Sequence, residues 1–108
     1  MAAFSDPEVR ARMEGVSALE SLDLESLVGQ VIVLDLGNPY VIMGTYRGAD
    51  GEYYVVENAD IHDLRDTTTT RDLYVLDAKR HGVNCNRKRV FVRREGVVGI
   101  SLLADVIE

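Results

Sequence analysis

The chain has 108 residues, of which 46% are hydrophobic, and its formal net charge is −6. This length fits one domain, and the apolar content predicts a packed core rather than a disordered chain. Cys85 is the only cysteine, so an internal disulfide is excluded and we expect a reducing, cytoplasmic location. The N-terminal stretch MAAFSDPEVRARMEG has no apolar run long enough for a signal peptide or a membrane span, so we expect a soluble protein without a membrane partner.

Charge is unevenly distributed along the chain. Residues 1–78 hold 5 Lys/Arg and 15 Asp/Glu, whereas residues 79–94 hold 7 Lys/Arg and no acid. This asymmetry indicates either a basic surface for an anion or two complementary faces in self-association. A solvated basic loop is the alternative interpretation.

A helix is predicted over about residues 6–22. Ser5-Asp6-Pro7-Glu8 is typical of a helix start, because Ser or Asp caps the helix and Pro fits the first turn. Gly15 could divide this helix. Apolar residues near helical spacing follow the start, at Val9, Met13, Val16, Leu19 and Leu22.

Strands are predicted next over residues 31–36, 40–46 and 52–59, separated by turns at 37–39 and 48–51. Both faces of the first strand are apolar, with Ile32, Leu34 and Leu36 on one face and Val31 and Val33 on the other. A strand buried on both sides in so small a protein needs a barrel interior on one face and a covering element on the other.

The middle segment, residues 67–83, is open to two interpretations. It could alternate as a strand through Leu73, Val75 and Asp77. We favour a helix over residues 71–81, because Thr69 and Asp72 resemble a capping box and Gly82 is typical of a left-handed helix end.

The last two predicted strands span residues 88–93 and 97–102. The connection between them begins with Arg93 and Arg94. Turns between strands favour Asn, Asp or Gly, so two arginines at the end of a strand require an explanation.

Two motifs in this order resemble the Sm/LSm family, the small RNA-binding barrels that include bacterial Hfq. Residues 24–60 are similar to the first motif at Leu27, Gly29, Val31, Val33, Gly37, Gly44 and Asp50. Residues 88–102 are similar to the second motif at Val90, Val92, Arg93, Val97 and Ile100.

The resemblance implies one Sm-like domain over residues 1–108. Its fold would be mainly β, a five-stranded, strongly bent open barrel with an N-terminal α-helix. Residues 61–87 then form an insertion that carries the helix 71–81 and projects from the barrel edge where the third and fourth strands meet.

Gly44 gives this fold a physical argument of its own. Glycine is unfavourable inside a strand, but it lets a sheet bend sharply enough to close. The alternative is that Gly44 marks only the end of a short strand.

The resemblance also implies a base-binding pocket, formed by an arginine after strand four and an asparagine after strand three. Arg93 matches the arginine. The asparagine is absent: its position falls on Tyr54 when counted from Asp50, and on Tyr53 when counted back from residues 55–59. Arginine and aromatic side chains can stack on bases. The candidate RNA-binding residues are therefore Asp50, Tyr53, Tyr54, Arg93 and Arg94, although either tyrosine could instead pack on a barrel strand.

A basic patch precedes the fourth strand and extends into it, formed by Arg87, Lys88 and Arg89. These side chains could contact phosphate or a neighbouring subunit, or they could only solvate a strand entrance.

Self-assembly is predicted because an open barrel leaves two strand edges unpaired. Strand four of one subunit would pair with strand five of the next in a head-to-tail contact. By resemblance, the ring would have five to seven subunits. The expected contact residues are Phe91, Val98 and Leu102.

Asp60, His62, Asp63, His81 and Cys85 could in principle bind a metal, but their spacing fits no standard site, and a polar strand end is the alternative. No Ser-His-Asp order or phosphate loop is present in the sequence, so we expect no enzyme, no metal and no cofactor.

Two functions stay open from the sequence. The basic segment 79–94 favours a ring that binds single-stranded RNA or scaffolds an RNA–protein complex. The acidic net charge favours a non-enzymatic, homo-oligomeric interaction module that has lost the RNA site.

Overall fold

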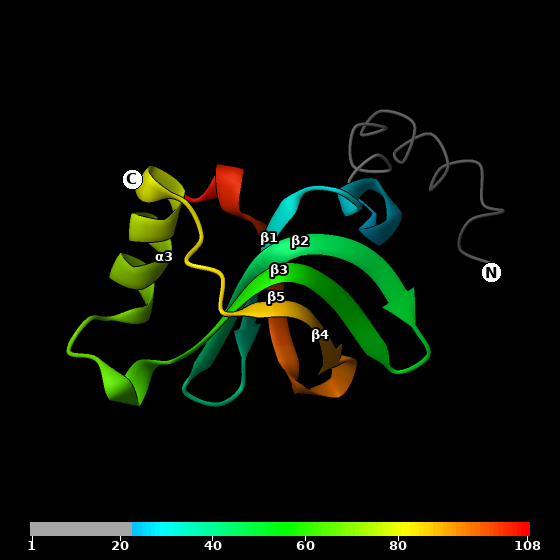
Figure 1. Ribbon diagram of the computed structural model, residues 1–108, viewed down its shortest axis with the longest axis horizontal. Helices are drawn as coiled ribbons and strands as arrows, with labels where there is room; N and C mark the ends of the chain where they lie inside the picture. The colour runs from blue at the N-terminus through cyan, green and yellow to red at the C-terminus, as the bar shows by residue number, and fades with distance from the viewer. Residues whose placement is uncertain (1–22) are drawn as a thin grey trace, which may run out of the picture.

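The computed structural model describes residues 23–108, so the predicted helix over about residues 6–22 lies outside the described residues. The described part contains strands β1 (Val31–Leu36), β2 (Tyr40–Asp50), β3 (Tyr53–Asp63), β4 (Arg87–Arg93) and β5 (Val97–Leu102), and helix α3 (Arg71–His81) (Figure 1). Short 3-10 helices are η2 (Leu24–Leu27), η3 (Leu64–Asp66), η4 (Arg94–Gly96) and η5 (Leu103–Asp105).

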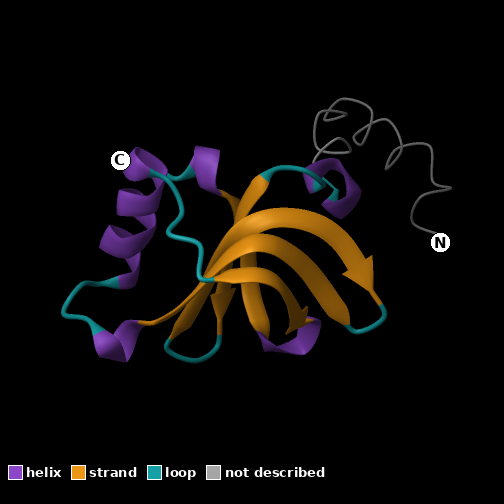
Figure 2. Cartoon of the chain, viewed as in Figure 1, coloured by secondary structure: helices purple, strands orange, loops and turns teal. Residues whose placement is uncertain are grey.

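The strands form one antiparallel sheet in the order β4-β3-β2-β1-β5. The long strands β2 and β3 curve strongly, so that the sheet wraps around its own interior (Figure 2). β4 and β5 are neighbours in sequence but lie at opposite edges of the sheet, joined by η4. The predicted five-stranded, strongly bent open barrel is therefore confirmed.

Gly44 lies at the bend of β2, where the register against β3 shifts between Met43 and Thr45. A β-carbon placed on Gly44 would lie 2.7 Å from Cγ1 of Val56 and 2.9 Å from Cα of Ala59. Only glycine allows the two strands to approach this closely. β2 continues well beyond Gly44, so the alternative of a short strand ending there is wrong.

β2 and β3 are both longer than predicted. The expected turn 48–51 is in fact mostly strand, and β2 ends only at Asp50, directly before Gly51. Register shifts in β2 and a positive φ of 48° at Asn58 in β3 let both strands continue through the bend.

The interior of the barrel is a cluster of apolar side chains from every strand. Buried members come from β1 to β4, and Ile100 and Leu102 of β5 pack against them. Leu27 of η2 is part of the same cluster.

A second cluster lies on the other face of the sheet, where α3 covers β1 and β2. Val75 and Ala78 of the helix pack with Val33, Val41 and Met43. The prediction that β1 needs both a barrel interior and a covering element is therefore confirmed. The expectation that the helix projects from the barrel edge is wrong, because burial of these side chains holds α3 against the sheet.

The predicted bounds of α3, residues 71–81, are confirmed. Its N-cap is Thr70, whose hydroxyl accepts a hydrogen bond from the Leu73 amide at 3.2 Å, so the capping box expected at Thr69 is wrong. Gly82 follows the helix with a positive φ of 94°, which favours glycine, but its ψ of 160° lies outside the left-handed helical region, so the expected left-handed helix end is wrong. No helix within residues 23–108 is both long and apolar enough to cross a membrane.

Candidate nucleic-acid interface

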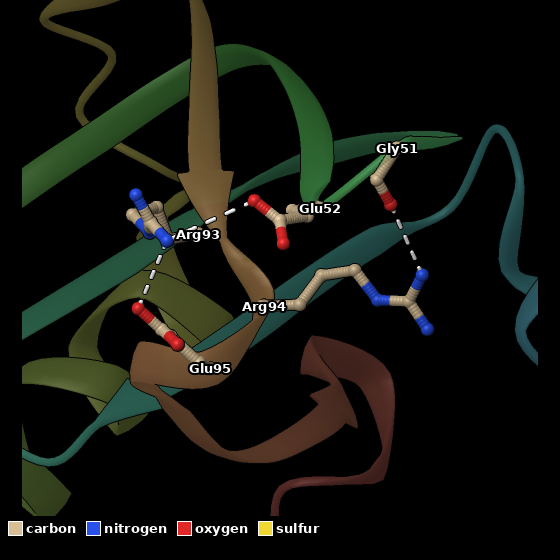
Figure 3. Close-up of a pocket in the computed structure, with 5 residues that line it drawn as sticks. All are labelled: Gly51, Glu52, Arg93, Arg94 and Glu95. Carbon is tan, nitrogen blue, oxygen red and sulfur yellow. Dashed lines mark hydrogen bonds and ion pairs between the residues drawn. The ribbon is translucent and has the colours of Figure 1, made fainter.

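The β2–β3 turn and the β4–β5 connection meet at one end of the barrel. Tyr53, the first residue of β3, is paired in register with Arg93, the last residue of β4. The Arg94 amide donates to the carbonyl of Glu52 at 2.8 Å, which fixes the two loops against each other. A pocket of about 220 Å³ lies between them, lined by Gly51, Glu52, Arg93, Arg94 and Glu95 (Figure 3).

Arg93 and Arg94 point in opposite directions from this connection (Figure 3). The Arg93 guanidinium lies 3.0 Å from the carboxylate of Glu95 and 3.8 Å from that of Glu52. All three side chains are more than half exposed, and exposed ion pairs of this kind contribute little energy. The Arg93 guanidinium can therefore exchange these carboxylates for another acceptor.

Arg94 instead closes the end of the barrel. Its guanidinium donates to the carbonyl of Gly51 at 3.2 Å and lies over the ring of Tyr54, with Cζ 5.4 Å from the ring centroid. Such cation–π contacts stabilise a fold. Both arginines are exposed, but their contacts differ: Arg93 lies beside the carboxylates of Glu52 and Glu95, whereas Arg94 contacts Gly51 and Tyr54.

The two candidate tyrosines lie on opposite faces of β3, as successive residues of a strand must. Tyr54 is only 8% exposed and packs in the barrel interior, with its ring 6.2 Å from that of Tyr46. Burial, together with Tyr54, raises the pKa of Tyr46. The packing interpretation therefore holds for Tyr54.

Tyr53 lies on the outer face and is 37% exposed. Its ring contacts that of Phe91 in β4 edge-on, with the ring centroids 6.4 Å apart and the planes at 84°. Sequence reasoning missed this pair, although the alternation in Arg89-Val90-Phe91-Val92-Arg93 places Phe91 on the same face as Arg93. Asp50, the remaining candidate, is exposed at the end of β2 and is paired in register with Tyr53.

The basic patch lies along the first half of β4 and is exposed. Arg89 makes two hydrogen bonds to one carboxylate oxygen of Glu57, at 2.7 and 3.0 Å, and Arg47 of β2 contacts the other oxygen of the same carboxylate at 3.2 Å. Two guanidinium groups therefore share one acid. The structure places Arg89 on the same face as Arg93, whereas Arg87 lies at the far end of the strand.

The residues expected at the subunit contact lie at opposite edges of the sheet. Phe91 is in β4, and Val98 and Leu102 are in β5. Phe91 is 57% exposed and Val98 is 72% exposed, whereas Leu102 is partly buried against the barrel interior. Self-pairing of β4 with β5 would be head-to-tail in this arrangement.

A polar cluster around Asp60 anchors α3 to the sheet. The buried carboxylate of Asp60 accepts hydrogen bonds from the Tyr74 hydroxyl and, at 3.0 Å, from the Asn86 amide. His62 stacks on the ring of Tyr74, with centroids 3.8 Å apart. Burial, and then the bond to Asp60, raises the pKa of Tyr74.

Asp63, at the end of β3, belongs to a separate ion pair. Its carboxylate lies 2.8 Å from the Arg65 guanidinium, and this hydrogen bonding lowers the pKa of Asp63 to about 2. Across residues 23–108, no three His, Cys, Asp or Glu side chains are grouped so that they could hold a metal ion. Asp60, His62 and Asp63 lie within the last four residues of β3.

Comparison with known proteins gives no match by sequence but several by structure. No protein-family model and no curated protein matches the sequence. The Sm protein of Pyrococcus abyssi, solved in complex with a uridine heptamer, superposes with a TM-score of 0.51 and 17% identity, over 75% of this chain and 94% of that one. The Sm-like (LSm) protein of Methanococcus vannielii gives a TM-score of 0.50 and 17% identity, over 76% and 91%.

A chain of the NatC complex bound to coenzyme A is also similar, with a TM-score of 0.49 and 14% identity over 74% of this chain and 83% of that one, which is too distant to carry an argument. The sheet order, the bend at Gly44 and the two archaeal superpositions agree with one another. This chain therefore has a divergent Sm-like fold.

Proposed function

We propose that the protein assembles into a homo-oligomeric ring and that the ring binds single-stranded RNA. The observation that carries this proposal is the place of Arg93, whose exposed guanidinium stands at the end of an open edge strand in an Sm-like fold. The ring would have five to seven subunits, and its function would be non-enzymatic.

Ring assembly is supported by the two free edges. Within residues 23–108, β4 and β5 each have no strand partner on one side, at opposite ends of the sheet order. Exposed edges either pair with another chain or are blocked. Pairing β4 of one subunit with β5 of the next would bring Val98 and Leu102 to the contact, with Phe91 close by.

RNA binding is supported by the chemistry of the barrel end. An arginine offers a planar fork for a base or phosphate and a face for stacking. The Pyrococcus abyssi protein of similar fold was solved with a uridine heptamer. Asp50, Tyr53, Arg93 and Arg94 are the candidates that are exposed at this end, whereas Tyr54 is buried.

A ring without an RNA site is the second candidate, and Glu52 and Glu95 favour it. Both carboxylates lie beside Arg93 and compete with any anion for its guanidinium. The net charge of −6 also opposes the approach of RNA. In this candidate the barrel would be an interaction module.

One experiment separates the two candidates. Fluorescence polarisation with labelled U-rich and A-rich oligoribonucleotides, at two salt concentrations, measures RNA binding, and light scattering measures the assembly. Binding that weakens with salt, on an assembly several times the subunit mass, supports the RNA-binding ring. An assembly that binds neither oligonucleotide supports the interaction module.

The exposed free thiol of Cys85 suits a reducing compartment, and we propose that the protein is located in the cytoplasm.

A further inference from the structure

The outer face of β3 and β4 carries aromatic and basic side chains together. Because directly paired residues of two strands share a face, Tyr53 lies beside Arg93, Val55 beside Phe91 and Glu57 beside Arg89. We call these six residues the β3–β4 outer face. Helix α3 packs over Val33, Val41 and Met43 of β1 and β2 and leaves Phe91 exposed.

The aromatic pair on this face is accessible. Phe91 is 57% exposed and Tyr53 is 37% exposed, and their rings stand nearly perpendicular at 84°. An edge-to-face pair holds both rings in fixed orientations while leaving ring surface open to solvent. A base can stack on such a pair with little further loss of side-chain conformational entropy, because the rings are already ordered.

Arg89 and Arg93 are the basic side chains of β4 on this face, and β4 carries no acidic residue. Arg93 lies beside the exposed carboxylates of Glu52 and Glu95, which a phosphate would have to displace. Glu57 is shared by Arg89 and Arg47, so one acid stands against two guanidinium groups. Arg89 and Arg93 flank Phe91, each two residues from it, which in an extended strand is about 7 Å. Cations therefore lie on both sides of the exposed ring.

We propose that the β3–β4 outer face is a stacking platform for the bases of a single-stranded nucleic acid, and this rests on the proposed RNA-binding function. Phe91 and Tyr53 stack on bases, and Arg89 and Arg93 contact the adjoining phosphates. Arg93 lies at the end of the platform and belongs also to the pocket between the two loops, so one strand can run from the pocket onto the sheet face. Phe91 is then a nucleic-acid contact rather than a subunit contact.

The test measures RNA affinity and assembly mass on the same variants. Phe91→Leu and Tyr53→Leu keep an apolar side chain but remove the aromatic ring, whereas Phe91→Tyr keeps it. Leu73→Ala, at an exposed position on α3, is the matched control. Each variant is titrated into a labelled U-rich and an A-rich oligoribonucleotide, and its mass is measured by light scattering. An A-rich oligonucleotide containing 2-aminopurine reports stacking directly through quenching of its fluorescence.

Loss of one stacking contact is expected to weaken binding about 5- to 150-fold in each leucine variant. Phe91→Tyr and Leu73→Ala should bind like the wild type, the mass should not change, and the quenching should be lost in Phe91→Leu. Wild-type affinity in both leucine variants, with Arg93→Ala weakened, would overturn the platform and leave the proposed function standing. A smaller assembly in Phe91→Leu would make Phe91 a subunit contact and also overturn it. If the wild type binds neither oligonucleotide, both proposals fail.

Discussion

Gly44 and Val56 face each other across the bend of the sheet, and a β-carbon on Gly44 would lie 2.7 Å from Cγ1 of Val56. The same β-carbon would lie 2.9 Å from the carbonyl oxygen of Glu57. A side chain could swing away, but the backbone of β3 is held between β2 and β4. The bend therefore depends on the absence of a side chain at one position.

We expect Gly44→Ala to lower the free energy of unfolding by about 1–3 kcal/mol, because overpacking forces the two strands apart. Urea unfolding followed by circular dichroism measures the change. Gly96→Ala is the control, since a β-carbon at Gly96 meets nothing within 4 Å, and it should stay within about 0.5 kcal/mol of the wild type. Equal stability of the two variants would show that the bend tolerates a side chain.

Substitutions of Arg93 and Arg94 should have different effects, the first on RNA binding and the second on stability. Arg93→Ala should weaken RNA binding by about 1–3 kcal/mol, the scale of a lost charge-assisted or stacking contact, and leave the melting temperature and the assembly mass unchanged. Arg94→Ala removes the bond to Gly51 and the contact over Tyr54, so it should lower the melting temperature. Polarisation and thermal unfolding on both variants check the pair. The assignment of roles is wrong if Arg94→Ala is as stable as the wild type.

The helix α3 gives a stability test in the second apolar cluster. Val75 is buried against the sheet, and Leu73 on the same helix is 58% exposed. Val75→Ala should cost about 1–3 kcal/mol, because it leaves a cavity over β1 and β2. Leu73→Ala should change the free energy of unfolding by less than about 0.5 kcal/mol. Similar effects of the two substitutions would mean that α3 is not packed through Val75.

Ionisation of the Tyr74 hydroxyl should lower the free energy of unfolding at alkaline pH. The pKa of Tyr74 is raised in the folded protein from its ordinary value of 10.0, mainly by burial and then by the bond to Asp60. The stability that neutral Tyr74 contributes is therefore complete below about pH 10 and is lost as the pH rises toward the folded pKa. Urea unfolding at about pH 8 and about pH 11 measures the loss.

Tyr74→Phe is the matching variant for this alkaline loss. It should be less stable at neutral pH by about 1–3 kcal/mol, because the buried Asp60 carboxylate loses a hydrogen bond. Its further loss of stability in alkali should be smaller than that of the wild type. Some loss will remain, since burial also raises the pKa of Tyr46. An alkaline loss as large as that of the wild type would remove Tyr74 as its source.

Local patterns were sufficient to predict much of the fold. The strand 31–36 and the helix 71–81 have their predicted bounds, because an apolar run bounded by a turn and a glycine after a helix are local signals. The lengths of β2 and β3 were underestimated, since Gly48 and Asn58 are typical of turns and here sit inside bulged strands. Whether an irregular residue ends a strand depends on its partner strand, which the local sequence does not show.

The candidate site was predicted less completely than the fold. Arg93 was identified by motif, but the direction of Arg94 depends on Gly51 and Tyr54, which lie far from it in sequence. The two register counts left Tyr53 and Tyr54 equivalent, and only the pairing of Tyr53 with Arg93 assigns their faces. The insertion was expected to project, because nothing in the pattern of α3 identifies β1 and β2 as the surface that it covers.

The last prediction concerns assembly, which follows from the edges of the sheet. β4 and β5 lie at opposite edges, and pairing them between copies would satisfy edge backbone groups that have no strand partner within residues 23–108. Each subunit then contacts two neighbours through different surfaces, and such a contact closes into a ring when the rotation between neighbours divides a full turn. We expect a mass five to seven times the subunit mass of 12.0 kDa in light scattering at moderate salt. Val98→Lys places a charge on the exposed β5 side chain and should reduce the mass, whereas Leu73→Lys on α3 should not. A wild-type mass near 12.0 kDa at micromolar concentration would exclude the ring.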